Sequence, residues 1–310
     1  MESEKRSEAL LFGSLLHKGL EAFWETKTEE GGAGNLEVAV AALKDEAINL
    51  DIFQQSGPYM PKLAELMLEA YCQKWRDDKY CALAVEKEFV LPMLDPVTNE
   101  QYNGWRISGK IDAIVKDLST GQTFLMDHKT AAGDVGAGSI YWKRLHFDPQ
   151  ISMYYHAAKR LGFDICGFVY DVLSKPNMDP KKATPPHKRK YKKSGEPYWW
   201  VVEEDETPEA YEDRLRADLD RNFETTFTRK VFTRTEDQLD AFQEELCSVA
   251  KRLDSTTSAE SALRNPTACF MYRSECAYIE ACAGGDIENL ENVCIKEPFP
   301  ELDELEEQDV

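Results

Sequence analysis

Residues 105–130 read W-R-I-S-G-K-I-D-A-I-V-K-D-L-S-T-G-Q-T-F-L-M-D-H-K-T, and the fold is organised around this stretch. Two apolar-rich runs flank the turn signal S-T-G-Q at 119–122, a pattern that predicts an antiparallel β-hairpin. Because side chains alternate between the two faces of a strand, we expect Asp127 and Lys129 to share one face. Asp112 comes from the preceding strand. Two carboxylates and a lysine on one sheet predict a site for a hard divalent cation and a phosphate.

Helices and strands follow one another over the remainder of the chain. Apolar periodicity predicts helices at 6–27, 36–52, 61–80, 148–161, 208–227 and 235–253. Apolar runs predict strands at 81–91, 164–173 and 198–202, and a long polar loop is expected at 174–197. The motif that begins at Thr235 resembles a capping box and marks the start of the last long helix.

The composition is that of a folded globule of one large domain or two smaller ones. The 310 residues are 42% hydrophobic and 11% aromatic, which is too apolar for a disordered chain. The sequence has no run of about 18 apolar residues, so no membrane span is expected. The N-terminal MESEKRSEALLF lacks the apolar core of a signal peptide, and we therefore expect a cytoplasmic protein.

The formal net charge is −20, which taken alone argues against a nucleic-acid-binding protein. The charge is unevenly distributed, however. Residues 297–310 carry seven acids and are expected to form a solvated, mobile tail. Residues 181–193, the basic segment, hold seven basic side chains and no acid: Lys181, Lys182, Lys188, Arg189, Lys190, Lys192 and Lys193. Because salt screens charges beyond about 8–10 Å, a local basic segment can bind phosphates on an acidic protein.

Aromatic residues lie beside the basic segment. Tyr191, Tyr198, Trp199 and Trp200 could stack on nucleic-acid bases. We therefore predict that the seven basic side chains contact DNA. The competing interpretation is a solvated loop, followed by an ordinary strand at 198–202.

Two helices supply further candidates for the hairpin site. His17 lies four residues after Gly13 on the first helix, and by itself it would be read as a packed helix histidine. Gln150 and Tyr154 are also four residues apart and share one face of a later helix. Burial explains Tyr154 but not Gln150 beside it. We expect this pair to position the DNA backbone or the scissile phosphate.

The strand at 81–91 brings two acids toward the hairpin. Glu86 and Glu88 share one face of this strand, and either could reach the site. The alternative, that they are charges of an edge strand, is equally consistent with the pattern.

The set of residue types suits phosphodiester hydrolysis, which needs a metal ion to polarise the phosphoryl oxygen. Asp112 and Asp127 supply the oxygen ligands that Mg²⁺ prefers. His17 would complete the ligand set and would favour Mn²⁺ somewhat, since imidazole is a softer ligand. Lys129 would orient the attacking water or offset charge in the transition state.

The order of these motifs resembles the RecB-like branch of the PD-(D/E)XK nuclease superfamily. The matching elements are G-K-I-D, then D-H-K-T, then Q-x-x-x-Y, together with G-x-x-x-H at 13–17 and V-E-x-x-F at 85–89. The resemblance covers residues of about 6–285. It implies metal and catalytic roles for His17, Asp112, Asp127 and Lys129, and a positioning role for Gln150 and Tyr154. His128 departs from the pattern, which has an apolar or aromatic residue there, so we expect it to point away from the metal and to be structural.

The same resemblance implies an α/β fold with a restriction-endonuclease-like core, in which helices flank a mixed central β-sheet. The expected organisation is a helical N-terminal region at 1–80, a nuclease core at 81–230 with the basic loop 174–197, a C-terminal helix and cysteine segment at 231–296, and an acidic tail at 297–310.

Four of the eight cysteines lie between 269 and 294, and in a cytosolic protein such clustering favours metal ligation over disulfides. The segment with Cys269, Cys276 and Cys282 resembles the one that ligates a [4Fe–4S] cluster in CRISPR-associated and helicase-associated RecB-like nucleases. Such a cluster usually needs four thiolates, and the relatives' first cysteine, before the G-x-x-x-H helix, is missing here. The fourth ligand could be Cys294, Cys72, Cys81 or a non-protein group. Zinc is the alternative metal, and inert cysteines are a third interpretation.

The function implied by the resemblance is a Mg²⁺- or Mn²⁺-dependent DNA nuclease. We expect an exonuclease that acts on DNA ends or single strands in recombination, repair or phage DNA processing, with recombination, CRISPR or phage proteins as candidate partners. The −20 charge motivates a different hypothesis, a catalytically weak DNA-binding or scaffolding subunit of a larger complex. A weaker third hypothesis is a zinc-organised protein with no DNA role.

Overall fold

The predicted hairpin forms the middle of a five-stranded sheet. Strand β3 (Gln101–Asp117) pairs antiparallel with β4 (Thr123–Ala131), and β4 runs parallel to β5 (Ile165–Ser174). Strands β2 (Tyr80–Leu94) and β6 (Phe227–Phe232) complete the order β2-β3-β4-β5-β6, in which β6 is antiparallel to β5. The sheet is therefore mixed, and the predicted α/β class is confirmed.

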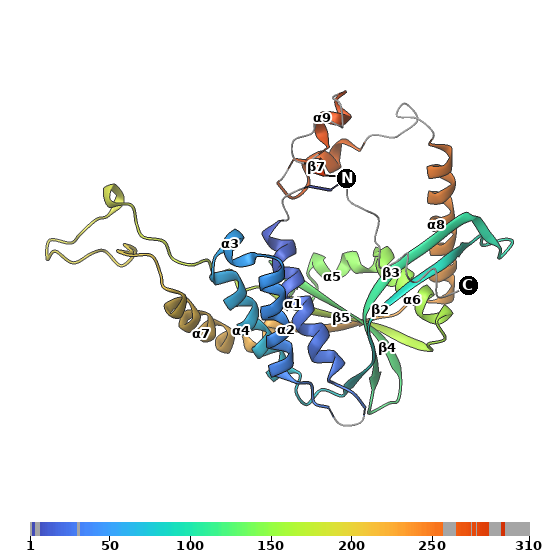
Figure 1. The fold of residues 1–310 in the computed structure, drawn as a ribbon, viewed down its shortest axis with the longest axis horizontal. Helices are drawn as coiled ribbons and strands as arrows, with labels where there is room; N and C mark the ends of the chain where they lie inside the picture. The colour runs from blue at the N-terminus through green and yellow to red at the C-terminus, as the bar shows by residue number, and fades with distance from the viewer. Residues whose placement is uncertain are drawn as a thin grey trace. The chain divides into compact units, whose positions relative to one another are not determined.

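The computed structural model describes residues 2–3, 7–29, 32–256, 265–273, 275–276, 278–284 and 293–294 (Figure 1). It divides into two compact units. Unit 1 comprises Met1–Ser7, Glu88–Lys110 and Thr235–Val310, and unit 2 comprises Glu8–Lys87 and Ile111–Arg234. The predicted acidic tail at 297–310 lies outside the described residues. His17, Asp112, Asp127, Lys129, Gln150 and Tyr154 all belong to unit 2, whereas Glu88 belongs to unit 1.

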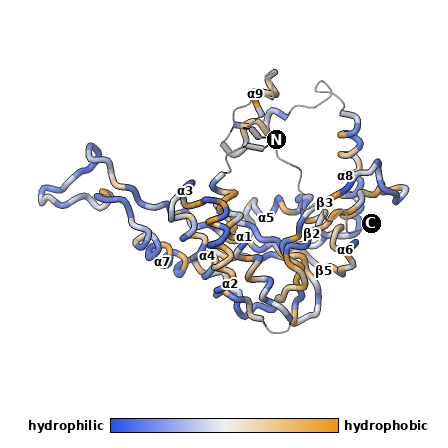
Figure 2. The backbone as a smooth tube through the Cα atoms, in the orientation of Figure 1, coloured by the Kyte–Doolittle hydropathy of each residue, from blue (hydrophilic) through white to orange (hydrophobic). Residues whose placement is uncertain are grey.

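The N-terminal helices of unit 2 pack together and, with β4 and β5, enclose its main apolar core. These helices are α1 (Glu8–Glu25), α2 (Leu36–Asn49), α3 (Ile52–Ser56) and α4 (Tyr59–Lys74). Figure 2 shows hydrophobic residues concentrated in the strands of the sheet. Gly19 of α1 permits close helix packing, because a Cβ there would lie 2.5 Å from the Leu68 side chain. The third predicted helix ends at Lys74 rather than at residue 80, since the chain turns before β2 begins.

Helix α6 (Pro149–Arg160) covers part of the opposite face of the sheet. Asp148 caps it, because its side chain accepts a hydrogen bond from the Gln150 N–H at 2.9 Å. Tyr154 stacks on Phe168 of β5, with ring centroids 6.4 Å apart. The short helix α5 (Ile140–Arg144), which the sequence pattern did not indicate, precedes α6.

The segment between β5 and α7 (Pro208–Thr226) extends away from the helices of its unit and contains the basic segment (Figure 1). The predicted strand at 198–202 is wrong. These residues form a turn in which the Val201 N–H donates to the Tyr198 carbonyl, and Trp199 is 92% exposed. Aromatic residues favour a strand only when a neighbouring strand offers a half-buried surface to pack against. In the described part of this segment, the pairing is limited to one bridge between Tyr191 and Pro197.

Unit 1 contains α8 (Glu236–Ser255), whose predicted capping box is confirmed by reciprocal hydrogen bonds between Thr235 and Gln238. Its remaining elements are β1 (Glu2–Ser3), which pairs with β7 (Val293–Cys294), the 3-10 helix η3 (Pro266–Arg273), and α9 (Ile279–Cys282). Over the described residues of both units, no helix combines the length and apolarity needed to cross a membrane.

Candidate active site

The hairpin brings two acids and a lysine to one face of the sheet. The β3–β4 register pairs Ala113 with Met126, which places Asp112 next to Asp127 across the strands. Asp127 is fully buried. The Lys129 ammonium donates to Asp127 Oδ1 at 2.9 Å and lies 2.8 Å from Oδ2. Because Lys129 keeps about a third of its side chain exposed, this ammonium connects the buried acid with solvent.

Helix α1 brings His17 to the same place. Its imidazole Nδ1 lies 3.6 Å from Asp112 Oδ2, and that oxygen also accepts a hydrogen bond from the His128 backbone N–H at 2.8 Å. Helix α1 contacts the end of β4 at Gly13, where a Cβ would sit at an ordinary contact distance of 3.8 Å from Thr130 Oγ1. Burial lowers the pKa of His17, and the Asp112 carboxylate opposes this shift.

The acids of the site repel one another in a buried setting. Burial raises the pKa of Asp127 to about 7, the neighbouring charge of Asp112 adds to this shift, and Lys129 opposes it. Burial would lower the pKa of Lys129, but Asp127 and Asp112 together hold it above its ordinary value. The site therefore disfavours the ionised form of Asp127, and Lys129 alone does not offset this.

Helix α6 places the predicted positioning pair beside these acids. Gln150 Nε2 donates to the Tyr154 hydroxyl at 3.0 Å. Burial raises the pKa of Tyr154 to about 12, with further contributions from the charges of Asp127, Asp112 and Glu86. These three carboxylates therefore lie near the Tyr154 hydroxyl.

Glu86 has a backbone conformation that is rare for its residue type. Its φ is +48°, in the left-handed region that non-glycine residues seldom adopt. Such conformations occur preferentially at functional sites. Of the two glutamates considered from the sequence, Glu86 lies in unit 2, and its charge contributes to the raised pKa of Tyr154.

Two polar residues beside the site were not singled out from the sequence. Tyr170 lies opposite Asp127 in the β4–β5 register, and its hydroxyl donates to Asp148 Oδ2 at 2.9 Å. Asp148 thus caps α6 with one oxygen and holds Tyr170 with the other. The signal available in the sequence was the pair Tyr170-Asp171 inside a mostly apolar strand.

His128 lies on the other face of β4, as its alternation with Asp127 predicts. Its ring stacks on Trp24 with centroids 6.0 Å apart, and its Nδ1 lies 3.2 Å from Asp171 Oδ2. Tyr71 also contacts it edge to face. The side chain is 3% exposed and fills a buried aromatic and polar cluster, in agreement with the structural role expected for it.

Asp171 is the centre of this second cluster. It accepts hydrogen bonds from the Tyr71 hydroxyl at 2.5 Å and from Arg229 Nη2 at 3.0 Å, and Arg229 Nε lies 3.0 Å from its other oxygen. Arg229 also pairs with Asp78 and lies over the Trp75 ring, 3.8 Å from the centroid. Burial alone would raise the pKa of Asp171, but Arg229 and His128 hold it well below its usual range. The ends of α4, β5 and β6 are joined by this cluster.

Comparison with known proteins decides the family. The family model described as the PD-(D/E)XK nuclease superfamily matches residues 2–283. The chain belongs to the PD-(D/E)XK nuclease superfamily. No curated protein matches it.

Solved structures similar to this PD-(D/E)XK nuclease include a Eubacterium rectale protein named “Putative exonuclease”. It is 14% identical, with a TM-score of 0.45, and the match covers 97% of this chain and 80% of that one. A second is SSO0001, also 14% identical, with a TM-score of 0.25 and coverage of 68% and 84%.

Proteins of the PD-(D/E)XK superfamily typically use divalent metal ions, and the donor atoms of this nuclease suit one. Asp112 and Asp127 offer carboxylate oxygens, the ligands that Mg²⁺ and Mn²⁺ prefer. Asp127 Oδ2 is buried and accepts no hydrogen bond of good geometry among the described residues, although the Lys129 ammonium lies 2.8 Å from it. Within those residues, no three His, Cys, Asp or Glu side chains are gathered as a ready metal cage. The set fits a cation that completes its shell with water and substrate oxygens, as Mg²⁺ commonly does.

The cysteines that suggested a second metal site lie in unit 1 of this nuclease. The Cys276 N–H donates to the Cys269 carbonyl at 2.9 Å, and Cys282 ends α9 shortly after. Cys269, Cys276 and Cys282 are free thiols, and the side chain of Cys294 lies outside the described residues. The described part of this segment brings Cys269 and Cys276 together through the backbone.

Proposed function

We propose that this nuclease is a Mg²⁺- or Mn²⁺-dependent deoxyribonuclease of the RecB-like branch, and that it acts as an exonuclease on DNA ends or single strands. One observation carries the proposal. Asp112, Asp127 and Lys129 converge on one face of the β3–β4 hairpin, where the ionised form of Asp127 is disfavoured and a bound cation would stabilise it.

Each residue of the site has a role that its position supports. Asp112, Asp127 and His17 would hold the cation, which when bound polarises a phosphoryl oxygen and makes hydroxide available near neutral pH. Lys129 is held by Asp127 and can orient the attacking water or offset charge on the phosphorus in the transition state. The His128 backbone N–H fixes Asp112 for this purpose.

Substrate contacts are proposed for α6 and for the basic segment. Gln150 and Tyr154 form one hydrogen-bonded unit that can position the backbone of the DNA strand next to the acids. In the basic segment, Arg189 already donates to the Thr184 and Glu203 carbonyls and so holds the two legs of the loop together. The lysines of this segment are exposed and are the proposed phosphate contacts.

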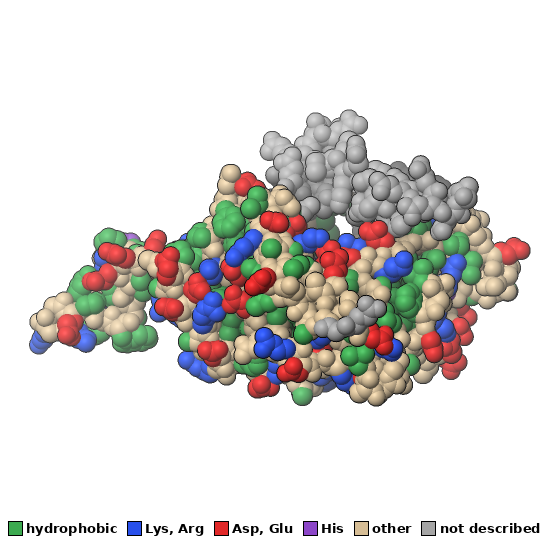
Figure 3. Space-filling model, turned by 60° about the horizontal axis from the view of Figure 1, so that its bottom comes forward, with side chains coloured by type: hydrophobic (Ala, Val, Ile, Leu, Met, Phe, Trp, Pro, Cys, Tyr) green, Lys and Arg blue, Asp and Glu red, His purple; other side chains and the backbone are tan. Residues whose placement is uncertain are grey.

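A local basic segment matters because the rest of the surface does not form a uniform positive field. On the face drawn in Figure 3, acidic and basic side chains are interspersed. With a net charge of −20, general electrostatic attraction to DNA is weak, so specific phosphate contacts must supply the affinity.

For the cysteine segment we propose thiolate ligation of an iron–sulfur cluster or of zinc. The closeness of Cys269 and Cys276 supports this. Absorption in the visible region together with metal analysis of anaerobically purified protein would distinguish the two metals, and a metal-free protein with unchanged folding would reject both.

The nuclease proposal is tested by incubating end-labelled single- and double-stranded DNA with purified protein and Mg²⁺ or Mn²⁺. We expect progressive shortening from an end, and loss of at least about 10²–10³-fold of the rate in Asp127→Ala and Lys129→Ala. Asp220→Ala, an exposed acid on α7, is the matched control. Undiminished cleavage in both site variants would reject the site assignment, and DNA binding without cleavage under either metal would favour the scaffolding alternative.

A further inference from the structure

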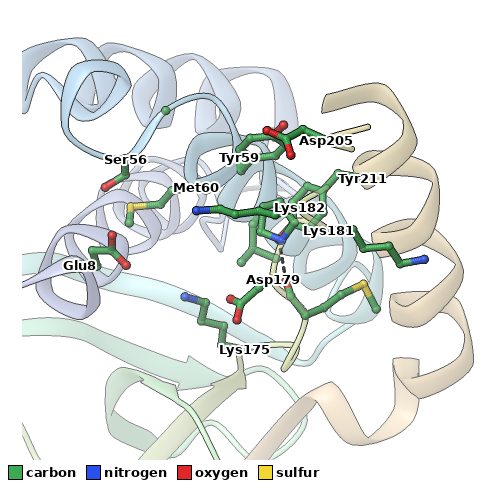
Figure 4. A pocket seen from close by; sticks show the side chains of 14 residues that line it. Glu8, Ser56, Tyr59, Met60, Lys175, Asp179, Lys181, Lys182, Asp205 and Tyr211 are labelled. Atoms are coloured by element: carbon green, nitrogen blue, oxygen red, sulfur yellow. Dashed lines mark hydrogen bonds between the residues drawn. The ribbon is translucent and has the colours of Figure 1, made fainter. Parts of the chain in front are cut away.

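A pocket that the catalytic roles do not use lies at the ends of β4 and β5. It has a cavity volume of about 630 Å³ and is formed by the start of α1, the α3–α4 turn, the chain after β5 and the start of α7 (Figure 4). Lys175, the first residue after β5, lines it, and the Lys175 N–H donates to the carbonyl of Ala131, the last residue of β4, at 2.7 Å. The pocket therefore begins where the strand that carries Asp127 and Lys129 ends.

The distance between the pocket and the candidate active site can be estimated from the rise per residue of two different elements. Four residues of β4 separate Ala131 from Asp127, a distance of roughly 13 Å at the rise of a strand. Nine residues of α1 separate Glu8, which lines the pocket, from His17, again roughly 13 Å at the rise of a helix. Both estimates place the pocket a few nucleotides of extended strand from the candidate metal position.

The floor of the pocket is apolar and fixed. Met60 and Leu63 of α4 are buried, and Tyr59 packs edge to face on Tyr211 with ring centroids 5.4 Å apart. Both tyrosine hydroxyls are engaged, Tyr59 with the Glu206 carbonyl and Tyr211 with the Met178 carbonyl. A surface of thioether, aliphatic and aromatic groups is one on which a planar base can lie.

The rim supplies charged groups. Lys175 and Lys182 extend into the pocket, whereas Lys181 points away from it (Figure 4). Among the residues that the structure describes, neither Lys175 nor Lys182 is held in an ion pair, and Lys175 lies over the Phe12 ring, 4.8 Å from its centroid. Of the acids in the lining, Asp205 is already bound by the Ala183 N–H at 2.7 Å. Glu8 and Asp179 also line the pocket, so its field is mixed and the two lysines must act as point contacts to phosphates.

We infer that this pocket binds an unpaired segment of the substrate DNA strand, with a base on the Met60–Leu63 floor and flanking phosphates on Lys175 and Lys182. The inference rests on the proposed function and sharpens it. A base can enter such a pocket only after it has left the duplex, so the enzyme prefers single-stranded DNA or strands that can fray. Lys182 is also the second residue of the basic segment, whose exposed lysines are the further phosphate contacts proposed above.

The test compares wild-type full-length protein with the Lys175→Ala/Lys182→Ala double variant. Binding of a fluorescent single-stranded oligonucleotide is measured in chelator, so that no cleavage occurs, and over a range of salt concentrations. We expect the Kd to rise about tenfold and the slope of log Kd against log salt to fall by roughly 1.4, about 0.7 for each lost phosphate contact. Asp179→Asn removes a pocket acid and is expected to tighten binding about two- to threefold. Lys44→Ala, an exposed lysine of α2, is the matched control.

A cleavage measurement separates a pocket defect from a damaged site. With Mg²⁺, the double variant is expected to raise the KM for long single strands about tenfold. The Lys175→Ala single variant should leave unchanged the cleavage of thymidine 5′-p-nitrophenyl phosphate, which is too short to reach the pocket. Unchanged binding and KM on DNA, or an equal loss on the small substrate, overturns the pocket assignment and leaves the nuclease intact. Binding that depends on both lysines without cleavage by the wild type rejects the nuclease proposal but keeps the pocket. A wild-type protein that neither binds nor cleaves DNA rejects both.

Discussion

The two faces of the β4–β5 pair each bury a carboxylate, and they shift its pKa in opposite directions. Asp127 on one face and Asp171 on the other are both fully buried. Burial and the charge of Asp112 raise the pKa of Asp127 to about 7. On the other face burial acts in the same direction, yet Arg229 and His128 overcome it and depress the pKa of Asp171.

The difference shows that the choice of partners, and not the degree of burial, decides what a buried acid does. Asp171 has a guanidinium with two contacts to its carboxylate, a tyrosine hydroxyl and an imidazole, so its charge is satisfied within the protein. Asp127 has one lysine and a neighbouring acid. The Asp171 face is built for stability, whereas the Asp127 face disfavours the ionised acid, which a bound cation would stabilise.

The same isosteric substitution on each face gives the sharpest test of this contrast. Asp127→Asn is expected to lower the single-turnover cleavage rate about 10³-fold. Its free energy of unfolding in chelator should change little, because the substitution removes the buried charge that Asp112 repels together with its ion pair to Lys129. Cleavage within a few-fold of wild type, or marked destabilisation, would mean that both faces are structural.

Asp171→Asn is expected to have its main effect on folding. Removal of one partner from a buried ion pair costs ~3–5 kcal/mol of unfolding free energy at neutral pH, because Arg229 is left without its main countercharge. Urea unfolding measures this loss. Asp220→Asn, at an exposed acid on α7, should stay within about 0.5 kcal/mol of wild type.

The stabilising effect of Asp171 should also depend on pH in a defined direction. Its pKa in the folded protein is depressed, so its contribution is complete above the unfolded value of about 3.9 and is lost as the pH falls below it. The stability difference between wild type and Asp171→Asn should therefore be largest near pH 7 and shrink below about pH 4. A difference that grew on acidification would contradict the depressed pKa.

His17→Ala tests whether α1 contributes to the Asp127 face. Loss of an imidazole ligand is expected to reduce Mn²⁺-supported cleavage about 10–100-fold and Mg²⁺-supported cleavage less, because imidazole contributes more to the softer ion. Metal titrations of the cleavage rate measure both. An equal loss with the two metals would assign His17 to packing against His128 and remove it from the ligand set.

The smallest expected effect is that of Gln150→Ala. Loss of one hydrogen bond to Tyr154 and to the bound strand should cost ~0.5–1.5 kcal/mol in kcat/KM, roughly two- to tenfold, with thermal stability retained. Steady-state kinetics on single-stranded DNA measure it. The control is Tyr155→Phe. Tyr155 follows Tyr154 on α6, but its hydroxyl donates to the Phe232 carbonyl, so this variant tests the effect of a lost α6 hydrogen bond on thermal stability.

The Asp127 face could be predicted from the sequence because its residues are related by local geometry. Asp127 and Lys129 share a strand face through the period of two, and Asp112 is brought back by a short turn. Gln150 and Tyr154 share a helix face through the period of 3.6 residues per turn. The secondary structure alone determines which of these residues share a face, because they lie only a few residues apart or are joined by a short turn.

The Asp171 face could not be predicted in this way. Its members come from α1, α4, β4, β5 and β6, and they meet only through the register of strands that are far apart in sequence. Strand β6 itself was not predicted, because the six residues F-T-R-K-V-F include the inward-pointing Arg229, which reads as polar until its partner Asp171 is known. Conversely, residues 198–202 have strand-forming side chains and lack a strand to pair with.

The backbone hydrogen bond between Lys175 and Ala131 ties the pocket to the end of the catalytic strand at a fixed separation. A fixed separation sets a shortest chain that can occupy both places at once. As a strand is digested, it eventually becomes too short to span them, and it then binds more weakly and is cut more slowly. Digestion should accordingly slow at oligonucleotides of a few nucleotides, and the length at which it slows would report the distance between the two sites.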